Sequence, residues 1–548
     1  MKFAKLLSVC LALVMAMSMM TAYATAESAR GIPEDHIYGK YEDPVTLTYA
    51  RSYSVAVKTD PNDPDIKSLD DNIWYNTYEK DLGIKLENLW TAEAGDYDQK
   101  WMMSMVNGDI PDFGIVSAKV YQQLLEADLI MDTTEIFDKY ASDLYREYNE
   151  AENWVSYNAI KKNGRLYGFP YPGFTAESVD LMYIRKDWLE AVDREVPKTL
   201  DELESLMDAF IEAELGGPDT LGMASFAGVR QYVNFIGGVL EGHGAYHNIW
   251  LEEDGELVYS NTTQKFKDGL LRLQDWYEKG YVREDFLTLD VNTGGEDVAA
   301  GRCGIVYGVY YTPISGGVAS SWANDNAEWV VAEIPTVDGS PAVSLGYNSP
   351  SIDRSAYFVS KDCENPEAII HLINFSMELR NNKKPELYED LRYNVRADGT
   401  SVFHHSVVSG TQIAWANLRC YNDCMAALEA GTGENLPATA KTSYEQIIKA
   451  MNGDVESKGM NLVFGVDGVY SVIGKMRSEG RNLITAYNTG STSTMLEKGA
   501  DLKQNLEAAM YKVIMGEDIS VYEEALDTWY KTGGEQITEE VNDWYRSR

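Results

Sequence analysis

Basic residues are scarce in this chain of 548 residues, which has 47 Lys and Arg against 86 Asp and Glu and a formal net charge of −39. A nucleic-acid backbone is bound through Lys and Arg that displace counterions, and no basic tract offsets the acidic excess. The composition therefore excludes a nucleic-acid partner and disfavours an anionic membrane surface. Because 45% of the residues are hydrophobic and 11% aromatic, the chain still has ample material for a core.

Cysteine is also rare. Cys10 lies in the N-terminal apolar run, and the remaining four cysteines are too few for a disulfide scaffold in a chain of this length. Cys420 and Cys424 are spaced i, i+4, which is not the tight C-x2-C spacing of a zinc knuckle. Thiols in the core or on the surface are therefore favoured over a metal site with His404 and His405. The disulfide state stays open for the four remaining residues, Cys303, Cys363, Cys420 and Cys424.

Long hydrophobic runs are missing beyond the first 26 residues. Lys2 and Lys5 precede an apolar run over 6–20, and small residues follow at Ala24 and Ala26. The run falls short of the ~20 residues that a membrane-spanning helix needs. This order predicts a secretory signal peptide over 1–26, so we expect an exported protein, extracellular or associated with the cell surface.

Strands alternate with helices in the next part of the chain. Apolar and polar residues alternate over 45–49, and short apolar runs over 84–89 and 111–116 are typical of further strands. Helical patterns lie between them, over 73–81 and 99–106. This alternation predicts an α/β layer and not a β-sandwich.

The stretch before the first of these strands, up to about Asp43, is polar and predicts a flexible tether or an extension that pairs with no strand.

The middle and the end of the chain favour helices. Thr199 and Glu202 form a capping-box pattern ahead of an apolar face that extends to Ile211. Helical spacing of apolar residues recurs over 266–277, 366–379 and 521–529. Pro366 stands at the first position of the segment 366–379, where helices tolerate proline. No repeat and no low-complexity linker divides the chain. Two lobes would therefore be woven together by several crossings of the chain.

Catalytic signatures are missing. Residues 468–475 nearly form a phosphate loop, but the glycine spacing is one residue too long and Met476 stands where Ser or Thr would hold magnesium. No G-x-S-x-G or H-E-x-x-H motif is present. His243 and His247 share an i, i+4 spacing, but the glycines beside His243 favour a loop over a metal site. The sequence thus indicates no catalytic residue, no metal and no cofactor.

Carboxylates and aromatic residues leave two functions open. A glycosidase needs two carboxylates at a defined separation across a cleft, and sequence spacing cannot show that separation. The chain has 36 Tyr and 12 Trp against 14 Phe. Tyr and Trp join a flat apolar face to a hydrogen-bonding edge, which suits sugars, although the same residues also serve as core.

Several motifs, in order, resemble the extracellular solute-binding proteins, family 1, of ABC importers. They are MMSMVNGDIPD at 102–112, NGRLYGFP at 163–170, and IRKDWLE at 184–190 followed by VPKTLDEL at 196–203. The resemblance extends over nearly all of the chain after the predicted signal peptide. Within this family, the chain is similar to the large carbohydrate-binding proteins of Gram-positive bacteria, which resemble alginate-oligosaccharide-binding proteins.

The resemblance implies an α/β fold of the periplasmic-binding-protein-like class II, with two α/β lobes joined by hinge strands and a ligand cleft between them. The expected N-lobe consists of 27–171 plus 346–400, and the expected C-lobe of 172–345 plus 401–548. Closure on a ligand need shift an equilibrium by only a few kcal/mol, because the ligand touches both lobes only in the closed state.

Candidate ligand contacts follow from the loops that meet the cleft in this fold. Tyr310 and Tyr311 stand out, because two adjacent residues on an extended segment cannot both face one core. The full candidate set is Arg51, Tyr53, Ser117, Lys119, Tyr171, Phe174, Glu177, Phe226, Arg230, Tyr310, Tyr311 and Trp415.

The chain departs from its resemblance at two places. Gram-positive members carry a lipidated Cys directly after the signal, whereas Cys10 lies inside the apolar run, which argues against a lipid anchor. Relatives of the alginate-binding type carry a calcium loop after the helix that matches 199–211. Residues 212–219 lack the alternating ligands of such a loop, so no structural calcium is expected there.

The sequence thus predicts a monomeric, non-enzymatic receptor that captures a carbohydrate and delivers it to the permease subunits of an ABC transporter. An oligosaccharide is the favoured carbohydrate. The alternatives are a secreted carbohydrate-active hydrolase and a binding protein for peptides or another small polar solute. If Arg51, Lys119 and Arg230 converge, they form a basic pocket that favours an acidic sugar.

Overall fold

The computed structural model describes residues 32–53, 57–173, 177–226, 234–289, 291–324, 327–346, 356–381, 384, 387–388, 402–408, 413–488 and 491–547. The chain forms two compact units. Unit 1 comprises Met1–Glu150, Ile160–Tyr171 and Arg354–Thr411, and unit 2 comprises Ala151–Ala159, Pro172–Asp353 and Gln412–Arg548. The lobe limits given above stay predictions.

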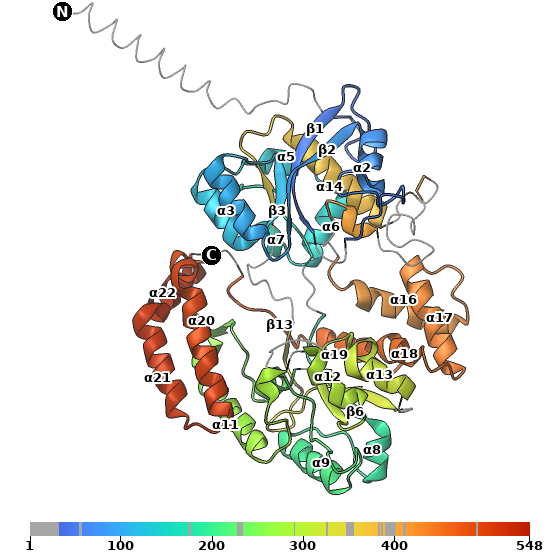
Figure 1. Ribbon diagram of the computed structural model, residues 1–548, viewed down its shortest axis with the longest axis vertical. Helices are drawn as coiled ribbons and strands as arrows, with labels where there is room; N and C mark the ends of the chain where they lie inside the picture. The colour runs from blue at the N-terminus through green and yellow to red at the C-terminus, as the bar shows by residue number, and fades with distance from the viewer. Residues whose placement is uncertain are drawn as a thin grey trace, which may run out of the picture. The chain divides into compact units, whose positions relative to one another are not determined.

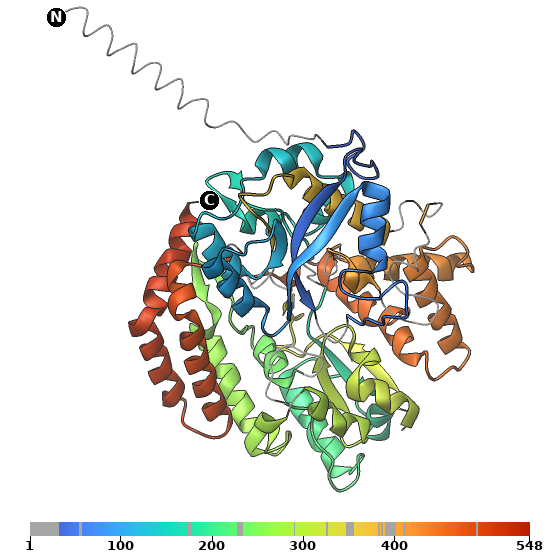
Figure 2. The ribbon, with the colours of Figure 1, turned by 45° about the horizontal axis from the view of Figure 1, so that its top comes forward.

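Unit 1 is built on a four-stranded sheet in the order β12-β3-β1-β2 (Figure 1). Its strands are β1 (Val45–Tyr53), β2 (Ile84–Glu93), β3 (Phe113–Val116) and β12 (Ala356–Val359). β1 runs parallel to both β2 and β3, and β12 is antiparallel to β3. The long pair β1 and β2 lies side by side in Figure 2, with a shift of register after Tyr49. All three strands expected from the sequence in this region are confirmed.

Helices cover this sheet. α3 contacts β2, while α4 contacts β3 and β12. The helices of unit 1 are α2 (Ile73–Thr77), its π-helical continuation η1 (Tyr78–Leu82), α3 (Tyr97–Asn107), α4 (Ala118–Glu126), α5 (Thr134–Tyr140), α6 (Asp143–Ala151, ending at the unit boundary), α14 (Pro366–Arg380) and the 3-10 turn η5 (Phe403–His405). A short hairpin joins β4 (Lys161–Lys162) to β5 (Arg165–Leu166).

The polar segment ahead of β1 is not a tether over its described part. The His36 carbonyl accepts a hydrogen bond of 3.2 Å from Asn374 of α14, and the Tyr41 ring lies 5.7 Å from the His371 ring on the same helix. The expectation of a tether was wrong because the segment, although polar on average, places aromatic rings where α14 offers an apolar face.

Unit 2 contains a three-stranded antiparallel sheet in the order β10-β6-β9. Its strands are β6 (Leu181–Arg185), β9 (Ile305–Gly308) and β10 (Trp329–Ala332), and the smaller pairs are β7 (Trp250–Glu253) with β8 (Glu256–Tyr259) and β11 (Ser344–Leu345) with β13 (Asn482–Leu483). All five residues of β6 are buried, because neighbouring strands and helices enclose both faces.

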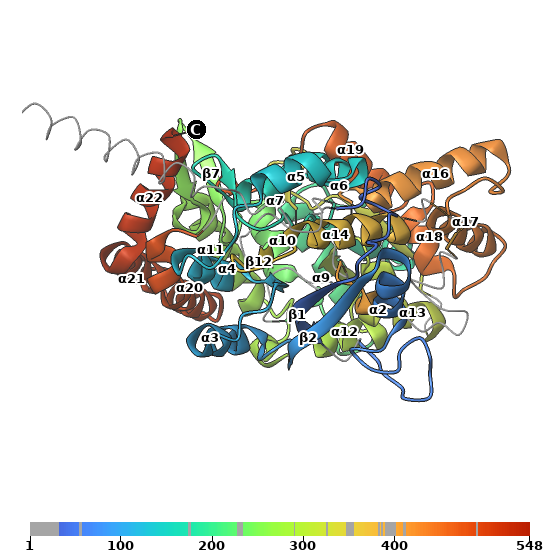
Figure 3. The ribbon, with the colours of Figure 1, turned by 90° about the horizontal axis from the view of Figure 1, so that it is seen from above.

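Most of unit 2 is helical. α16, α17 and α18 pack against one another, and α20 packs against both α21 and α22 (Figure 3). The helices are α7 (Val155–Ala159), α8 (Lys186–Ala191), α9 (Leu200–Glu212), α10 (Phe235–Gly242), α11 (Gln264–Glu278), α12 (Val291–Ala299), α13 (Gly316–Asn324), α16 (Ala416–Ala430), α17 (Ala438–Met451), α18 (Lys458–Phe464), α19 (Val469–Ser478), α20 (Ser493–Ile514), α21 (Ser520–Trp529) and α22 (Glu535–Arg546).

The capping box expected at the start of α9 is present. The Thr199 hydroxyl accepts a hydrogen bond of 3.0 Å from the Glu202 amide, and the Glu202 carboxylate accepts one of 3.2 Å from the Thr199 amide. This reciprocal pair satisfies two of the amides that a helix start leaves open. The apolar face that follows, from Leu203 to Phe210, is buried.

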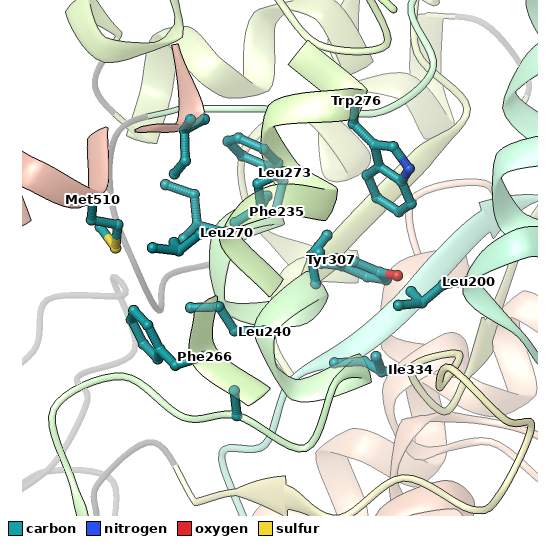
Figure 4. Packing of buried hydrophobic residues seen from close by; sticks show 14 of the residues in the cluster. Leu200, Phe235, Leu240, Phe266, Leu270, Leu273, Trp276, Tyr307, Ile334 and Met510 are labelled. Atoms are coloured by element: carbon teal, nitrogen blue, oxygen red, sulfur yellow. The ribbon is translucent and has the colours of Figure 1, made fainter. Parts of the chain in front are cut away.

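The largest apolar cluster of unit 2 gathers around α10 and α11. Figure 4 shows Phe235, Leu240, Phe266, Leu270 and Leu273 turned toward one another, with Met510 of α20 reaching them from a distant part of the sequence. Tyr307 of β9 lies against α10, where Gly238 leaves room for its ring.

Cysteine chemistry does not hold these units together. Cys303, Cys363 and Cys424 are buried and Cys420 is half-buried, and all four are free thiols. Among the described residues, no helix is both long and apolar enough to cross a membrane.

The close contact between α10 and β9 predicts the effect of one added methyl group. A Cβ at position 238 would lie 2.1 Å from Cδ2 of the buried Tyr307 ring. We expect Gly238→Ala to lower the free energy of unfolding by about 1–3 kcal/mol, because a packed aromatic ring cannot move aside. Urea unfolding followed by circular dichroism measures this loss.

The matched control is Gly499→Ala in α20, where the nearest atom, Cβ of Met495, is 3.8 Å away. That change is expected to be neutral or to stabilise by up to about 1 kcal/mol. Equal effects at the two positions would contradict the packing described here.

Candidate functional site

Five candidates lie in unit 1, and three of them lie near one edge of its sheet. Tyr53 ends β1, and Ser117 directly follows β3. Because these strands are parallel neighbours, their carboxyl ends share an edge, which is where α/β sheets place their ligands. Ser117 begins α4: its hydroxyl accepts a hydrogen bond of 3.3 Å from the Val120 amide and donates one of 2.7 Å to Asp98. Lys119 is exposed one residue into the helix.

Arg51, the fourth, is buried, with 3% of its surface exposed. Its guanidinium donates to the Tyr75 hydroxyl at 3.0 Å and to the carbonyls of His404 and His405 at 2.9 and 3.2 Å. Arg51 therefore ties α2 and η5 to strand β1 and presents little surface to a ligand.

Tyr171 is half-buried where unit 1 ends, and its ring meets that of Tyr357 edge-on at 5.0 Å. Phe226 of unit 2 is 4% exposed and belongs to the apolar core that contains β6 and β9. Phe174 and Arg230 lie outside the described residues.

The remaining four candidates come together in unit 2. Glu177 contacts the first turn of α16, which Trp415 directly precedes. The half-buried Tyr310 ring lies 5.1 Å from that of Tyr311 at an interplanar angle of 87°, and burial together with the Glu177 charge raises the pKa of the Tyr310 hydroxyl. The neighbouring Asn417 side chain opposes that rise. We call Glu177, Tyr310, Tyr311, Trp415 and Asn417 the α16 cluster.

The start of α16 is capped by a residue from elsewhere in the chain. Trp415 occupies the N-cap position with a left-handed backbone (φ 64°), and its side chain makes no capping hydrogen bond. The Glu177 carboxylate takes this role: it accepts from the amides of Asn417 at 3.4 Å and Leu418 at 3.3 Å. These are the second and third helical residues, whose amides an N-cap side chain normally satisfies.

Two neighbours of this cluster were not among the sequence candidates. Asn417 donates from its amide nitrogen to Glu177 at 3.1 Å, and the Arg477 guanidinium lies 4.0 Å over the Trp415 ring. Asn417 could have been found from its place beside Trp415. Arg477 could not, because α19 approaches α16 only through the tertiary fold.

The electrostatics of this site are dominated by burial. Only 1% of Glu177 is exposed, and this desolvation raises the pKa of its carboxyl to about 7. The hydrogen bonds from Leu418 and Asn417 and the charge of Arg477 pull the pKa the other way but do not cancel the burial.

Unit 2 also has a surface hollow of about 680 Å³ beside α10. Glu241, Trp250 and Lys265 are among the residues that line it, and no candidate residue does. Within the described part of the chain, no group of three or more His, Cys, Asp or Glu side chains is placed to hold a metal ion.

Comparison with curated proteins finds relatives along almost the whole chain. The polygalacturonan/rhamnogalacturonan-binding protein YtcQ of Bacillus subtilis (strain 168) is 22% identical over 495 residues, covering 85% of this chain and 88% of the relative. Lipoprotein LipO of the same strain is 20% identical over 86% and 88%. The fructooligosaccharide ABC transporter substrate-binding protein FusA of Streptococcus pneumoniae is 24% identical over 46% and 47%. No family model matches the chain.

Solved structures show the same architecture. The alginate-binding protein AlgQ2, solved without calcium ion, superposes with a TM-score of 0.59 at 14% identity, covering 92% of this chain and 98% of that one. FusA of S. pneumoniae in complex with kestose gives a TM-score of 0.59 at 16% identity over 92% and 99%.

The expected resemblance is confirmed. The homologues of this chain are substrate-binding proteins of carbohydrate ABC transporters, and its fold is that of periplasmic-binding-protein-like sugar-binding proteins, with mixed helix and sheet in both units. YtcQ and FusA are binding proteins by name.

The buried Glu177 carboxylate predicts a pH-dependent stability. Its pKa in the folded protein, about 7, lies above the ordinary value of 4.5, so the folded state binds the proton more tightly than the unfolded state. The stability due to this group is therefore complete below pH 4.5 and is lost as the pH rises through 7. A shift of this size corresponds to about 3 kcal/mol.

Glu177→Gln removes this titration, so the difference in unfolding free energy between the variant and the wild type should change by about 3 kcal/mol between pH 4.5 and 8, in favour of the variant at high pH. Urea unfolding of both proteins across this range measures the difference, in which the other carboxylates cancel. A constant difference would show that Glu177 titrates normally.

Proposed function

We propose that this protein is the extracellular solute-binding receptor of an ABC importer, which captures an oligosaccharide and delivers it to a membrane permease. The observation that carries the proposal is the match to YtcQ, a polygalacturonan/rhamnogalacturonan-binding protein, over 88% of the length of that relative. Relatives whose names state a sugar include binders of polygalacturonan and rhamnogalacturonan and of fructooligosaccharides.

The α16 cluster supports a sugar as the ligand. Tyr310, Tyr311 and Trp415 are half-buried, and Asn417 and the tyrosine hydroxyls supply hydrogen-bonding groups beside them. Aromatic faces pack on the C–H faces of sugar rings, and polar groups at their edges bind the hydroxyls. The Arg477 guanidinium over Trp415 adds a positive charge, which favours a sugar that carries carboxylates.

The proposal includes the cellular setting and the partners. Residues 1–26 direct export, and the protein acts outside the cell as a monomer that performs no chemistry on its ligand. Its partners are the permease subunits of the transporter. The place of Cys10 inside the apolar run argues against a lipid anchor. Capture between two lobes and the ligand contacts from both of them stay predictions of the resemblance.

A thermal-shift screen tests this function. The panel contains neutral and uronic-acid oligosaccharides together with a set of short peptides. A ligand at 100 times its dissociation constant should stabilise the protein by about 2.7 kcal/mol. Stabilisation by sugars with no new products in chromatography is the expected result. Released shorter sugars would support a hydrolase, and stabilisation by peptides alone would overturn the carbohydrate proposal.

Tyr310 and Tyr311 provide a test at the level of residues. Replacing both with Ala should weaken binding of the best sugar by at least tenfold, because two stacking faces are lost, while the protein stays folded. Isothermal titration calorimetry measures the affinity and circular dichroism the fold. Phe226→Ala is the control: this core residue should lower the melting temperature and leave the affinity of the folded protein unchanged. A collapse of the double variant would assign both tyrosines to the core.

A further inference from the structure

The start of α16 has an unfavourable backbone conformation and lacks a capping side chain of its own. Trp415 is a bulky residue in the left-handed region, which costs energy and persists only where the surroundings hold it. An indole has no oxygen that could accept from the amides of Asn417 and Leu418. Glu177, which lies more than two hundred positions away in the sequence, supplies the missing acceptor.

Glu177 is poorly placed to bind a ligand itself. Its side chain is 1% exposed, and both carboxylate oxygens are engaged by α16: Oε1 by the backbone and side-chain amides of Asn417, and Oε2 by the Leu418 amide. A sugar hydroxyl could reach this carboxylate only by displacing the helix start.

The groups that Glu177 holds are the ones suited to a sugar. Its hydrogen bond to the Asn417 side chain orients that amide, which lies close enough to Tyr310 to act on the pKa of its hydroxyl. Its hydrogen bonds to the backbone amides also hold the turn on which Trp415 is mounted, with its ring under Arg477. The buried Glu177 carboxylate thus fixes the positions of both the Trp415 ring and the Asn417 amide.

We propose that Glu177 is a positioning residue of the ligand site: it caps α16 from outside the helix and thereby fixes Trp415 and Asn417 in the geometry that binds the sugar. This inference rests on the proposed function and replaces the direct contact that the sequence assigned to Glu177.

The same arrangement makes the site sensitive to pH. The groups that face Glu177 are Tyr310, Cys420 on α16, and Arg477 and Tyr470 on α19, with Arg419 beside Arg477. Arg477 is the cation that favours the ionised carboxylate. Burial raises the pKa of Glu177 to about 7, so the folded arrangement favours the neutral carboxyl, and ionisation above that pH destabilises the buried position of Glu177 at the start of α16.

The first arm of the test needs no ligand. Tryptophan fluorescence of the wild type minus that of Trp415→Phe isolates the signal of Trp415. This difference should change with a midpoint near pH 7 and should lose its pH dependence in the Glu177→Gln background, because Gln does not titrate there. A signal that is constant from pH 5 to 9 in the wild type would overturn the proposal.

The second arm measures affinity by calorimetry at pH 6 and pH 8, with kestose as a neutral probe, trigalacturonic acid as an acidic one, and the best sugar of the panel. Wild-type affinity should be lower at pH 8 than at pH 6, because ionisation destabilises the buried carboxyl at the start of α16, and the affinity of Glu177→Gln should be equal at both values. Affinities of variant and wild type that are equal at both pH values would overturn the positioning role.

The matched control is Asp297→Asn. Asp297 is likewise a buried carboxylate of unit 2, 2% exposed, but it lies on α12 and binds Arg302 at 3.0 Å. This variant should lower the melting temperature without altering the pH profile of binding. If it alters the profile as Glu177→Gln does, the effect is general loss of stability and the inference fails.

Failure of every sugar to stabilise the wild type would instead contradict the proposed function, while the fluorescence arm still reports on Trp415 alone.

Discussion

The hydrogen bonds between the Glu177 carboxylate and the start of α16 are the interaction on which the candidate site depends. A helix start leaves several amides without partners, and this one is preceded by Trp415, which cannot satisfy them. Glu177 satisfies two, and its negative charge lies at the positive end of the helix. Each such contribution amounts to about 0.5–2 kcal/mol, which is enough to decide where a first turn begins. The place of Trp415, and with it the platform for Arg477, follows from that decision.

Burial of the Glu177 carboxylate and its hydrogen bonds to α16 have opposite effects on its ionisation. Ionisation strengthens its bonds to the helix amides, whereas removal from water favours the neutral form and raises the pKa to about 7. The outcome is a group that changes charge close to neutral pH inside a cluster of rings. Arg51 of unit 1 is also buried, but its guanidinium donates hydrogen bonds to two carbonyl oxygens and a tyrosine hydroxyl. An arginine keeps its positive charge at neutral pH, so burial does not make it titrate there. Structural arginines and functional carboxylates thus differ in how burial acts on their charge.

Local patterns allowed a large part of the fold to be predicted. The capping box of Thr199, the alternation of β1 and the proline at the start of α14 each depend on neighbours within a few residues, and all three elements form as expected. The segment around Tyr41 was misjudged because its partner, α14, lies far away in the sequence. Among the candidate residues, Phe226 was chosen for its loop, but the surrounding side chains bury it. Residue type and loop position indicate where a ligand could be met, whereas exposure depends on everything packed around the residue.

The sequence by itself determined the acidic composition, the absence of catalytic and metal motifs, and the alternation of strands and helices, together with the motifs that resemble solute-binding proteins. These are properties of neighbouring residues or of totals, and they need no folded chain. Only the tertiary structure decided that Glu177 caps α16, that Arg477 covers Trp415 and that Arg51 donates its hydrogen bonds to backbone carbonyls. The reason is physical: each of these contacts joins segments separated by tens to hundreds of residues, and no spacing rule connects them before the chain has folded.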